Sequence, residues 1–285
     1  MEILGIYIFM LIYRIAATPF PENALIASDS DRDFHAPIDL LWNDLTGPIE
    51  TDIEQNGLGD GWMLATLASI VNSSGGQDLI KTIIKNNTDK NKADILLYNS
   101  DGKDQKSYTV SKPSLADLQN GFFSNAGGFS ISGGTGMSEA HSWVACMEKA
   151  MEMAGYKTEV ESGDWPYYAI KIIYGGDNGR WISISSLSDD NLWTRILAAP
   201  GVPTVADSND HPAKGIVSQH SYSLLGSTTG DKTGQIVLRN PWGKINSNIW
   251  GIPNNPGNFP DLGNGKFSMS LDTFRNSFDA IDYLH

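Results

Sequence analysis

The first stretch of the sequence with residue types suited to catalysis reads QNGLGDGWMLATLASIV, residues 55–71. A glutamine, a glycine-rich loop and Asp60 lead into an apolar run that starts at Trp62. Asp60 is a favourable N-cap residue, so the pattern predicts a buried helix that begins near Gly61. Backbone N–H groups and the helix macrodipole stabilise an anion at such a position, which would activate a thiolate. The residue there is glycine, which carries no nucleophile.

Two polar residues in later strand-like runs have the types that would serve a nucleophile at position 61. His220 lies in VSQHSYSLLG, and Asn240 lies in LRNPWG, where Trp242 can cover a polar pair. A nucleophilic Cys/His/Asn site needs a thiolate, a histidine that shares its proton and an amide that orients the imidazole. Each residue alone has an ordinary interpretation, a core histidine for His220 and a turn residue for Asn240. Their combination with the Gln55 stretch predicts one site.

The first half of the chain is expected to be mainly helical. Apolar residues recur at helical spacing over 138–155, and Cys146 lies on the apolar stripe of that helix. Two short strand-like runs, 93–98 and 107–110, lie between this helix and the one near Gly61. We therefore predict a helical lobe over residues 18–163, with Cys146 packed in its core.

The second half of the chain has the pattern of an antiparallel sheet. From residue 164 onward, short alternating or apolar runs are separated by Gly, Pro and Asn, which is typical of strands and turns. One short helix is expected over 271–278. These features predict an α+β fold in which a β-rich lobe, residues 164–285, follows the helical lobe. The three motifs suit a single site where the two lobes join.

Composition limits the classes of function. The 285 residues are 40% hydrophobic, which is enough for one sizeable core or two lobes that share a cleft. The net charge of −13, without a long basic cluster, argues against nucleic acid as a partner. The single cysteine, Cys146, rules out an internal disulfide and a CxxC metal or redox site.

The N-terminus has the pattern of a secretory signal peptide. An apolar run over 3–13 is followed by Ala16 and Ala17, small residues that suit signal cleavage. Glu2, and the lack of a basic residue before the run, are atypical, so a mis-assigned start codon and a membrane anchor stay open as alternatives. The run of eleven residues falls short of the ~20 that span a bilayer. We expect residues 1–17 to be a signal peptide and the chain to be secreted, with no membrane partner after cleavage; otherwise it is cytoplasmic.

The three motifs together resemble those of the calpain family of cysteine proteases. The family motif has a glutamine, a glycine-rich loop and Gly-Asp-Cys-Trp, and residues 55–62 match it with Gly61 in place of the cysteine. The stretch that starts at His220, HSYS, matches the family's histidine motif. The stretch that starts at Arg239, RNPWG, matches its asparagine motif residue for residue. The resemblance covers about residues 34–284 and is specific because the three motifs occur in order.

The resemblance implies a two-lobed, papain-like protease core and a role for each motif residue. By this resemblance, Gln55 belongs to the oxyanion hole and His220 is the base. Asn240 orients His220, and Trp242 shields the pair. The resemblance also implies that a protein or peptide substrate binds in the cleft between the lobes. The oligomeric state is left open.

Gly61 is the departure from the family pattern that decides the expected activity. Glycine can neither attack a carbonyl nor form an acyl-enzyme, and removal of the nucleophile from such a triad costs on the order of 10⁶ in rate. We therefore expect a cysteine endopeptidase fold that is inactive as written. Two alternatives stay open: a pseudoprotease that binds peptides as a decoy, inhibitor or effector, and a trapped form of an active enzyme.

Calcium binding is the second departure. The resemblance implies a calcium site in each lobe, and Asp52 matches part of the first-lobe site, although it also reads as an ordinary surface acid. Its acidic partner before Trp143 is uncertain, because Glu139 is near and His141 is closer. Residues 244–258 of the second lobe carry no carboxylate, whereas calcium takes roughly six to eight oxygen ligands. We therefore expect no certain cofactor, and at most one weak calcium ion at Asp52.

Overall fold

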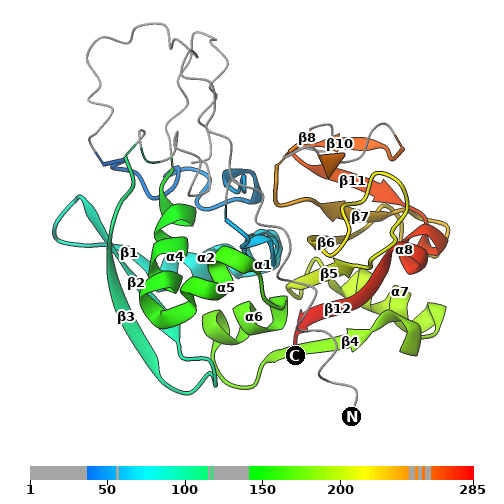
Figure 1. Cartoon of the computed structure of the whole chain (residues 1–285), viewed down its shortest axis with the longest axis horizontal. Coiled ribbons are helices and arrows are strands. Elements are labelled where there is room, and N and C mark those ends of the chain that lie inside the picture. The colour runs from blue at the N-terminus through cyan, green and yellow to red at the C-terminus, as the bar shows by residue number, and fades with distance from the viewer. Residues whose placement is uncertain are drawn as a thin grey trace, which may run out of the picture.

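The computed structural model describes residues 37–55, 58–114, 117, 141–243, 248–249, 252–253 and 258–285. The predicted signal peptide and the start of the predicted helical lobe lie outside these residues. In the described part of the chain, no helix combines the length and apolar character needed to cross a membrane. The fold is α+β: helices and a small sheet come first, and a seven-stranded antiparallel sheet follows (Figure 1).

The central element is helix α1, Gly61–Asn72, which lies between the small sheet and the large one (Figure 1). Because its sequence is apolar nearly all round, it packs against α2 and α6 and also against strands β5 and β6 of the large sheet. Asp60 occupies the N-cap position as predicted, but its side chain makes no capping hydrogen bond. The helix ends where the Ser73 N–H donates to Ile70 O at 2.9 Å, and Gly75 then adopts a φ of 75° that begins the next turn.

Further helices surround α1. The predicted helix 138–155 is confirmed over α4, Trp143–Met151, and residues 138–140 lie outside the described part. A turn of π-helix, Glu152–Tyr156, follows α4, and Gly155 within it has a φ of 100°, which kinks the chain. The other helices on this side are α2 (Gly76–Ile83), α5 (Lys157–Ser162) and α6 (Pro166–Tyr174).

A small antiparallel sheet flanks these helices, with strands β1 (Ile84–Asn86), β2 (Lys92–Tyr98) and β3 (Gln105–Ser111). The predicted strands 93–98 and 107–110 are confirmed. Residues of β2 alternate between buried and half-buried, so one face of the strand lies against α4 and α6.

Seven strands of the second half form one antiparallel sheet, in the order β10-β11-β7-β6-β5-β12-β4 (Figure 1). This sheet confirms the prediction of a β-rich second half. Two further short strands, β8 (Asn248–Ile249) and β9 (Ile252–Pro253), pair separately. The strands of the large sheet are β4 (Gly179–Ser183), β5 (Thr204–Ser208), β6 (Ser221–Ser227), β7 (Ile236–Arg239), β10 (Asp261–Gly263), β11 (Lys266–Met269) and β12 (Phe278–Leu284).

The second half also contains helices that the sequence pattern does not predict. Helices α6 and α7 (Asp189–Ala198) were not expected. Helix α8, Leu271–Ser277, confirms the helix expected over 271–278. Ser188 caps α7, since its Oγ accepts a hydrogen bond from the Asn191 N–H at 3.3 Å. The first turn of α7 carries two aspartates. The residues that mark the start of α7 are polar, so a prediction based on apolar runs does not detect this helix.

The two faces of the large sheet differ in chemistry. The face that contributes Tyr222 forms its own apolar core with α7 and α8. The face toward α1 and α6 is polar: Ser223 Oγ donates to Ala65 O at 2.7 Å, and the Tyr167 N–H donates to Asp282 Oδ1 at 3.0 Å. Helix α6 packs into the apolar core around α1, although it lies beyond residue 163. This core is separate from the apolar core of the large sheet, and hydrogen bonds join the two parts.

Substitution of Leu67 tests whether α1 is the central helix of the first core. Its side chain is fully buried, so Leu67→Ala is expected to lower the free energy of unfolding by about 2–5 kcal/mol. Leu45 is 95% exposed, and Leu45→Ala is expected to change it by less than ~0.5 kcal/mol. Denaturant unfolding of both variants measures the difference; equal effects would contradict the assignment of α1 as the central helix.

Candidate active site

The topology brings the three sequence motifs to one place. Gly61 is the first residue of α1, His220 directly precedes β6, and Asn240 directly follows β7. Strands β6 and β7 are antiparallel neighbours, with Ser223 opposite Arg239, so the start of β6 lies beside the end of β7. Because α1 packs against β6, its N-terminus faces the same region.

His220 and Asn240 are in hydrogen-bond contact, which confirms the expected contact. Nε2 of His220 donates to Oδ1 of Asn240 at 3.0 Å. The Trp242 N–H donates to the same oxygen at 3.0 Å and so fixes the orientation of the amide. The buried Trp242 ring lies 5.1 Å from the imidazole and covers the pair. With Nε2 engaged as the donor, Nδ1 keeps a lone pair that can accept a proton.

Gly61 lies between the two side chains that would assist a nucleophile. A Cβ atom on Gly61 would be 3.1 Å from Oε1 of Gln55 and 3.2 Å from Cε1 of His220. A side chain at position 61 would therefore project between the glutamine and the imidazole. Both distances are short for a carbon contact, so the two neighbours would have to move by a few tenths of an ångström to admit it.

Gln55 is held in the site by its backbone and its side chain. Its N–H donates to Pro241 O at 2.9 Å, which ties it to the turn that carries Asn240. Its Nε2 donates to Leu58 O at 2.9 Å, and its buried Oε1, on the side of Gly61, has no hydrogen-bond partner among the described residues. A half-turn of the amide would exchange the two atoms and present an N–H toward position 61.

The environment of His220 favours the neutral imidazole. Burial lowers the pKa of His220 to about 4, and the hydrogen bond to Asn240 opposes this only in part. The Tyr222 ring packs edge-on against the imidazole at 5.0 Å and contributes to the apolar surroundings. At neutral pH, His220 is therefore in the form that can accept a proton.

The side chain of Asp60 does not make the capping hydrogen bond that its position predicts. Its side chain is fully buried at the start of α1, and burial raises its pKa to about 6. Its oxygens make no hydrogen bond of good geometry in the described part of the chain, but the nearby Glu148 and Gln55 side chains lower the pKa in part. Glu148, on α4, is also buried. The sequence pattern did not predict that this second acid lies beside Asp60.

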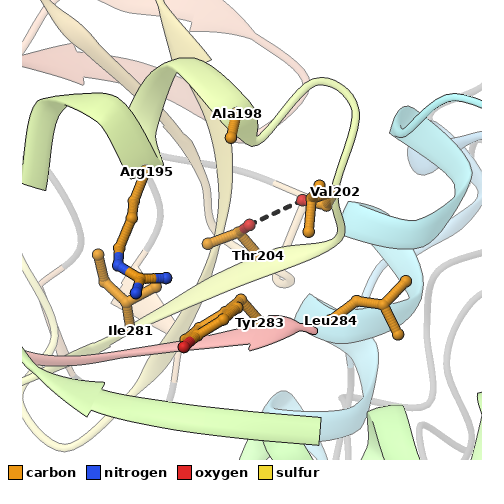
Figure 2. A pocket seen from close by; sticks show the side chains of 7 residues that line it. All are labelled: Arg195, Ala198, Val202, Thr204, Ile281, Tyr283 and Leu284. Carbon is orange, nitrogen blue, oxygen red and sulfur yellow. Dashed lines mark hydrogen bonds between the residues drawn. The ribbon is translucent and has the colours of Figure 1, made fainter. Parts of the chain in front are cut away.

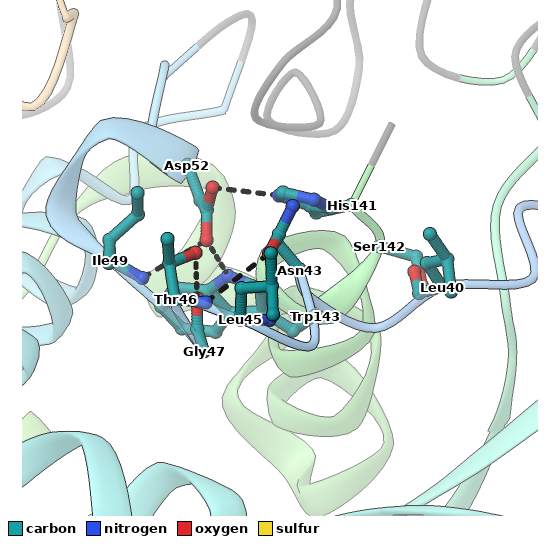
Figure 3. A network of polar contacts seen from close by, with 10 residues as sticks. All are labelled: Leu40, Asn43, Leu45, Thr46, Gly47, Ile49, Asp52, His141, Ser142 and Trp143. Carbon is teal, nitrogen blue, oxygen red and sulfur yellow. Dashed lines mark hydrogen bonds and ion pairs between the residues drawn. The ribbon is translucent and has the colours of Figure 1, made fainter. Parts of the chain in front are cut away.

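Asp52 lies in a buried network that links the segment before Gln55 to α4 (Figure 3). Its Oδ1 lies 2.9 Å from Nδ1 of His141. Its Oδ2 accepts hydrogen bonds from Nε1 of Trp143 at 2.8 Å and from the Ile49 N–H at 3.1 Å. This network anchors the short 3-10 turn Glu50–Asp52, three residues before Gln55.

The residues around Asp52 do not fit a calcium ion. Calcium is bound by several oxygen ligands, whereas both Asp52 oxygens contact nitrogen atoms, and His141 stands beside Asp52 where a second acid would be needed. The described residues contain no group of three or more His, Cys, Asp or Glu side chains that could hold a metal ion. Glu139, and most of residues 244–258, lie outside them.

Cys146 is not placed to replace the nucleophile. It lies on α4 with no exposed surface, as the helical pattern predicts. Burial raises the pKa of its thiol to about 11, so the reactive thiolate is scarce at neutral pH.

A hollow of about 220 Å³ lies in the second half (Figure 2). It is formed by α7, β5 and β12, and its lining includes Val202, Thr204 and Leu284. The guanidinium of Arg195 lies 4.3 Å from the ring centre of Tyr283 there. None of the residues predicted from the sequence as site residues lines this hollow.

In comparisons with known proteins, no protein-family model and no curated protein matches the chain.

The low pKa of His220 is testable by NMR. Because its folded pKa of about 4 lies below the ordinary 6.5, the imidazole should stay neutral down to pH 5 in the folded chain. Because the pKa is lower in the folded chain than in the unfolded chain, the neutral imidazole contributes its full stability to the fold above pH 6.5. That stability is lost as the pH falls from 6.5 toward 4. Titration of the His220 Cε1 proton in native buffer, with the urea-unfolded chain as control, checks the shift. A native value near 6.5 would contradict the described environment.

Calcium should have little effect on this chain. Since Asp52 is paired with nitrogen atoms, addition of ~1 mM calcium, or of a chelator, is expected to leave the midpoint of thermal unfolding unchanged. His141→Ala should lower that midpoint, because it leaves Oδ1 of the buried Asp52 without its hydrogen-bond partner. Two tight calcium sites in calorimetry would refute this interpretation.

Proposed function

We propose that this chain is a calpain-type cysteine endopeptidase scaffold with a papain-like, two-lobed fold, in which Gly61 occupies the nucleophile position. The observation that carries the proposal is the direction in which a side chain at position 61 would point. A Cβ there would lie within 3.2 Å of both Gln55 and His220, and His220 is hydrogen-bonded to Asn240. The proposed lobes are residues 18–163 and 164–285, joined through the polar face of the large sheet.

The described groups support the chemistry of acyl transfer. A thiolate at position 61 would attack the peptide carbonyl, and His220 Nδ1 would take the thiol proton and later donate it to the leaving amine. The negative oxygen of the tetrahedral intermediate would be stabilised by N–H groups at the start of α1 and by the Gln55 amide in its turned orientation. Asn240 would hold the imidazole in the required tautomer.

With glycine at position 61, this sequence of steps cannot begin. Glycine has no atom that can attack, so no acyl-enzyme forms, and the loss is on the order of 10⁶ in rate. We therefore propose that the chain as written does not cleave peptide bonds. We also propose that it is secreted, because of the signal-peptide pattern in residues 1–17.

A pseudoprotease is the alternative function, and Gly61 itself favours it. The His220–Asn240 contact and the Trp242 cover are present without a nucleophile. A protein or peptide held beside them would be bound and released intact. Such a chain would act as a decoy, an inhibitor or an effector.

Restoring the nucleophile separates the two functions. Gly61→Cys is expected to cleave casein, whereas the chain with Gly61 is not, because the thiol would join an arranged base and amide. In the Gly61→Cys background, His220→Ala should reduce cleavage by about 10⁴–10⁶-fold. Release of acid-soluble peptides over time measures both effects.

The matched control is Cys146→Ser in the Gly61→Cys background, which should keep full activity because Cys146 is buried and unreactive. If a folded Gly61→Cys chain binds casein and leaves it intact, the endopeptidase scaffold is refuted and the pseudoprotease function is favoured.

A further inference from the structure

Two asparagines of the chain lie in the pattern Asn-x-Ser/Thr, which is the acceptor pattern for N-linked glycosylation of secreted proteins. The first pattern, Asn-Ser-Ser, begins at Asn72, and the second, Asn-Asn-Thr, begins at Asn86. In neither is the middle residue proline, which would prevent the modification. Both patterns lie in the part of the chain that the structure describes, so their surroundings can be compared.

Asn86 is placed to carry a bulky group. It is the last residue of β1 and is exposed. Its side chain makes no hydrogen bond with any other described residue. Strand β1 is an edge strand, because in the small sheet it pairs with β2 alone. A group attached at Asn86 would therefore break no hydrogen bond of the described chain.

The neighbouring Asn87, by contrast, has its side chain fully engaged. Its Nδ2 donates to both carboxylate oxygens of Asp94, at 2.9 and 2.8 Å. Its Oδ1 accepts a hydrogen bond from the Asp89 N–H at 3.0 Å. These contacts order the turn between β1 and β2, whereas Asn86 and Thr88 remain exposed there. The turn thus presents the asparagine and the threonine of the acceptor pattern to solvent.

The acceptor pattern at Asn72 has less room. Asn72 is exposed at the end of α1, but Ser73 after it is buried. The Ser74 N–H donates to Pro200 O at 3.2 Å, which ties this pattern to the second half of the chain. A glycan at Asn72 would therefore crowd the junction of the two halves, and Asn86 is the better placed acceptor.

We propose that Asn86 carries an N-linked oligosaccharide. The donor is an oligosaccharide joined to a membrane polyprenyl diphosphate, and a transferase of the host cell moves it. The bond between the anomeric carbon and the diphosphate oxygen breaks, and that carbon forms a bond to Nδ2 of Asn86. Nδ2 gives up one proton to solvent, and the polyprenyl diphosphate leaves with the electron pair of the broken bond. This inference rests on the proposed secretion, because the transfer takes place inside the secretory pathway.

A glycan at Asn86 would cover the free edge of the small sheet and leave the candidate active site open. Edge strands offer unpaired N–H and C=O groups to other chains, and a bulky polar group at the edge hinders such pairing. The small sheet lies across α1 from β6 and β7, the strands beside His220 and Asn240 (Figure 1). The modification is therefore compatible with a polypeptide bound beside His220.

The test expresses the full chain, with its own N-terminus, in cultured mammalian cells. Chain from the medium and from the cell extract is treated with peptide N-glycosidase in heavy-oxygen water, which converts a glycosylated asparagine to a labelled aspartate. Trypsin cuts after Lys85 and Lys90, so Asn86 is released in a short peptide that does not contain Asn72. Fragment spectra should place the label at residue 86 in most of the secreted chain.

Two variants remove the acceptor pattern in different ways. Asn86→Gln and Thr88→Ala should each reduce the mass that the glycosidase removes by one glycan, since each destroys the pattern. Asn91→Gln is the matched control, because Asn91 is an exposed asparagine of the same turn that lies outside any acceptor pattern. A mass loss that survives Thr88→Ala unchanged would overturn the assignment.

The outcomes separate this inference from the proposals on which it rests. An unlabelled Asn86 in chain from the medium, or a label at Asn72 alone, would refute the inference and leave the proposed secretion standing. A chain that stays in the cells and carries no glycan would refute both. Neither result bears on the endopeptidase scaffold, which casein cleavage by the Gly61→Cys chain tests separately.

Discussion

The arrangement of the site depends on polar contacts between the first half of the chain and one face of the large sheet. The buried Arg239, at the end of β7, donates from Nη2 to Ile53 O at 2.6 Å. Burial lowers the pKa of Arg239 to about 10, and the nearby acids, led by Glu50, oppose this. Glu50 also pairs with Lys266 of β11 at 3.1 Å, and Gln55 bonds the Pro241 carbonyl. These contacts hold the segment before α1 against the strands that carry His220 and Asn240.

The position of Gly61 follows from this junction. The α1 N-terminus lies over the adjoining ends of β6 and β7, so any side chain at its first residue would project toward the imidazole. The Asp52 and His141 pair anchors the same segment from the other side, to α4. Polar contacts therefore hold the segment before α1 in place on both of its sides. These contacts explain why the site is assembled although its residues come from both halves of the chain.

Part of this structure was predictable from the sequence, for identifiable physical reasons. Helix α1 was predictable because an N-cap residue leads into an apolar run, and the alternating strands were predictable because burial of one face imposes a period of two. The contact of His220 with Asn240 was predictable because the ordered motifs restrict those residues to one chemistry. Helix α7 was not, since its start signals are polar. The Asp60–Glu148 neighbours were not either, because this pair joins elements distant in sequence whose contact only the tertiary fold determines.

We propose that position 61 is a nucleophile position from which only the nucleophile is missing. The most direct measurement is the rate of iodoacetamide reaction with the Gly61→Cys chain as a function of pH. The reaction should be fast near pH 6, where an ordinary thiol with a pKa of about 8.5 is almost wholly protonated, because the α1 macrodipole and a protonated His220 would stabilise the thiolate. A thiolate at position 61 would raise the pKa of His220 from its value in the chain with Gly61. A thiol that reacts only above pH 8, with the same profile after His220→Ala, would show that position 61 is not a nucleophile position.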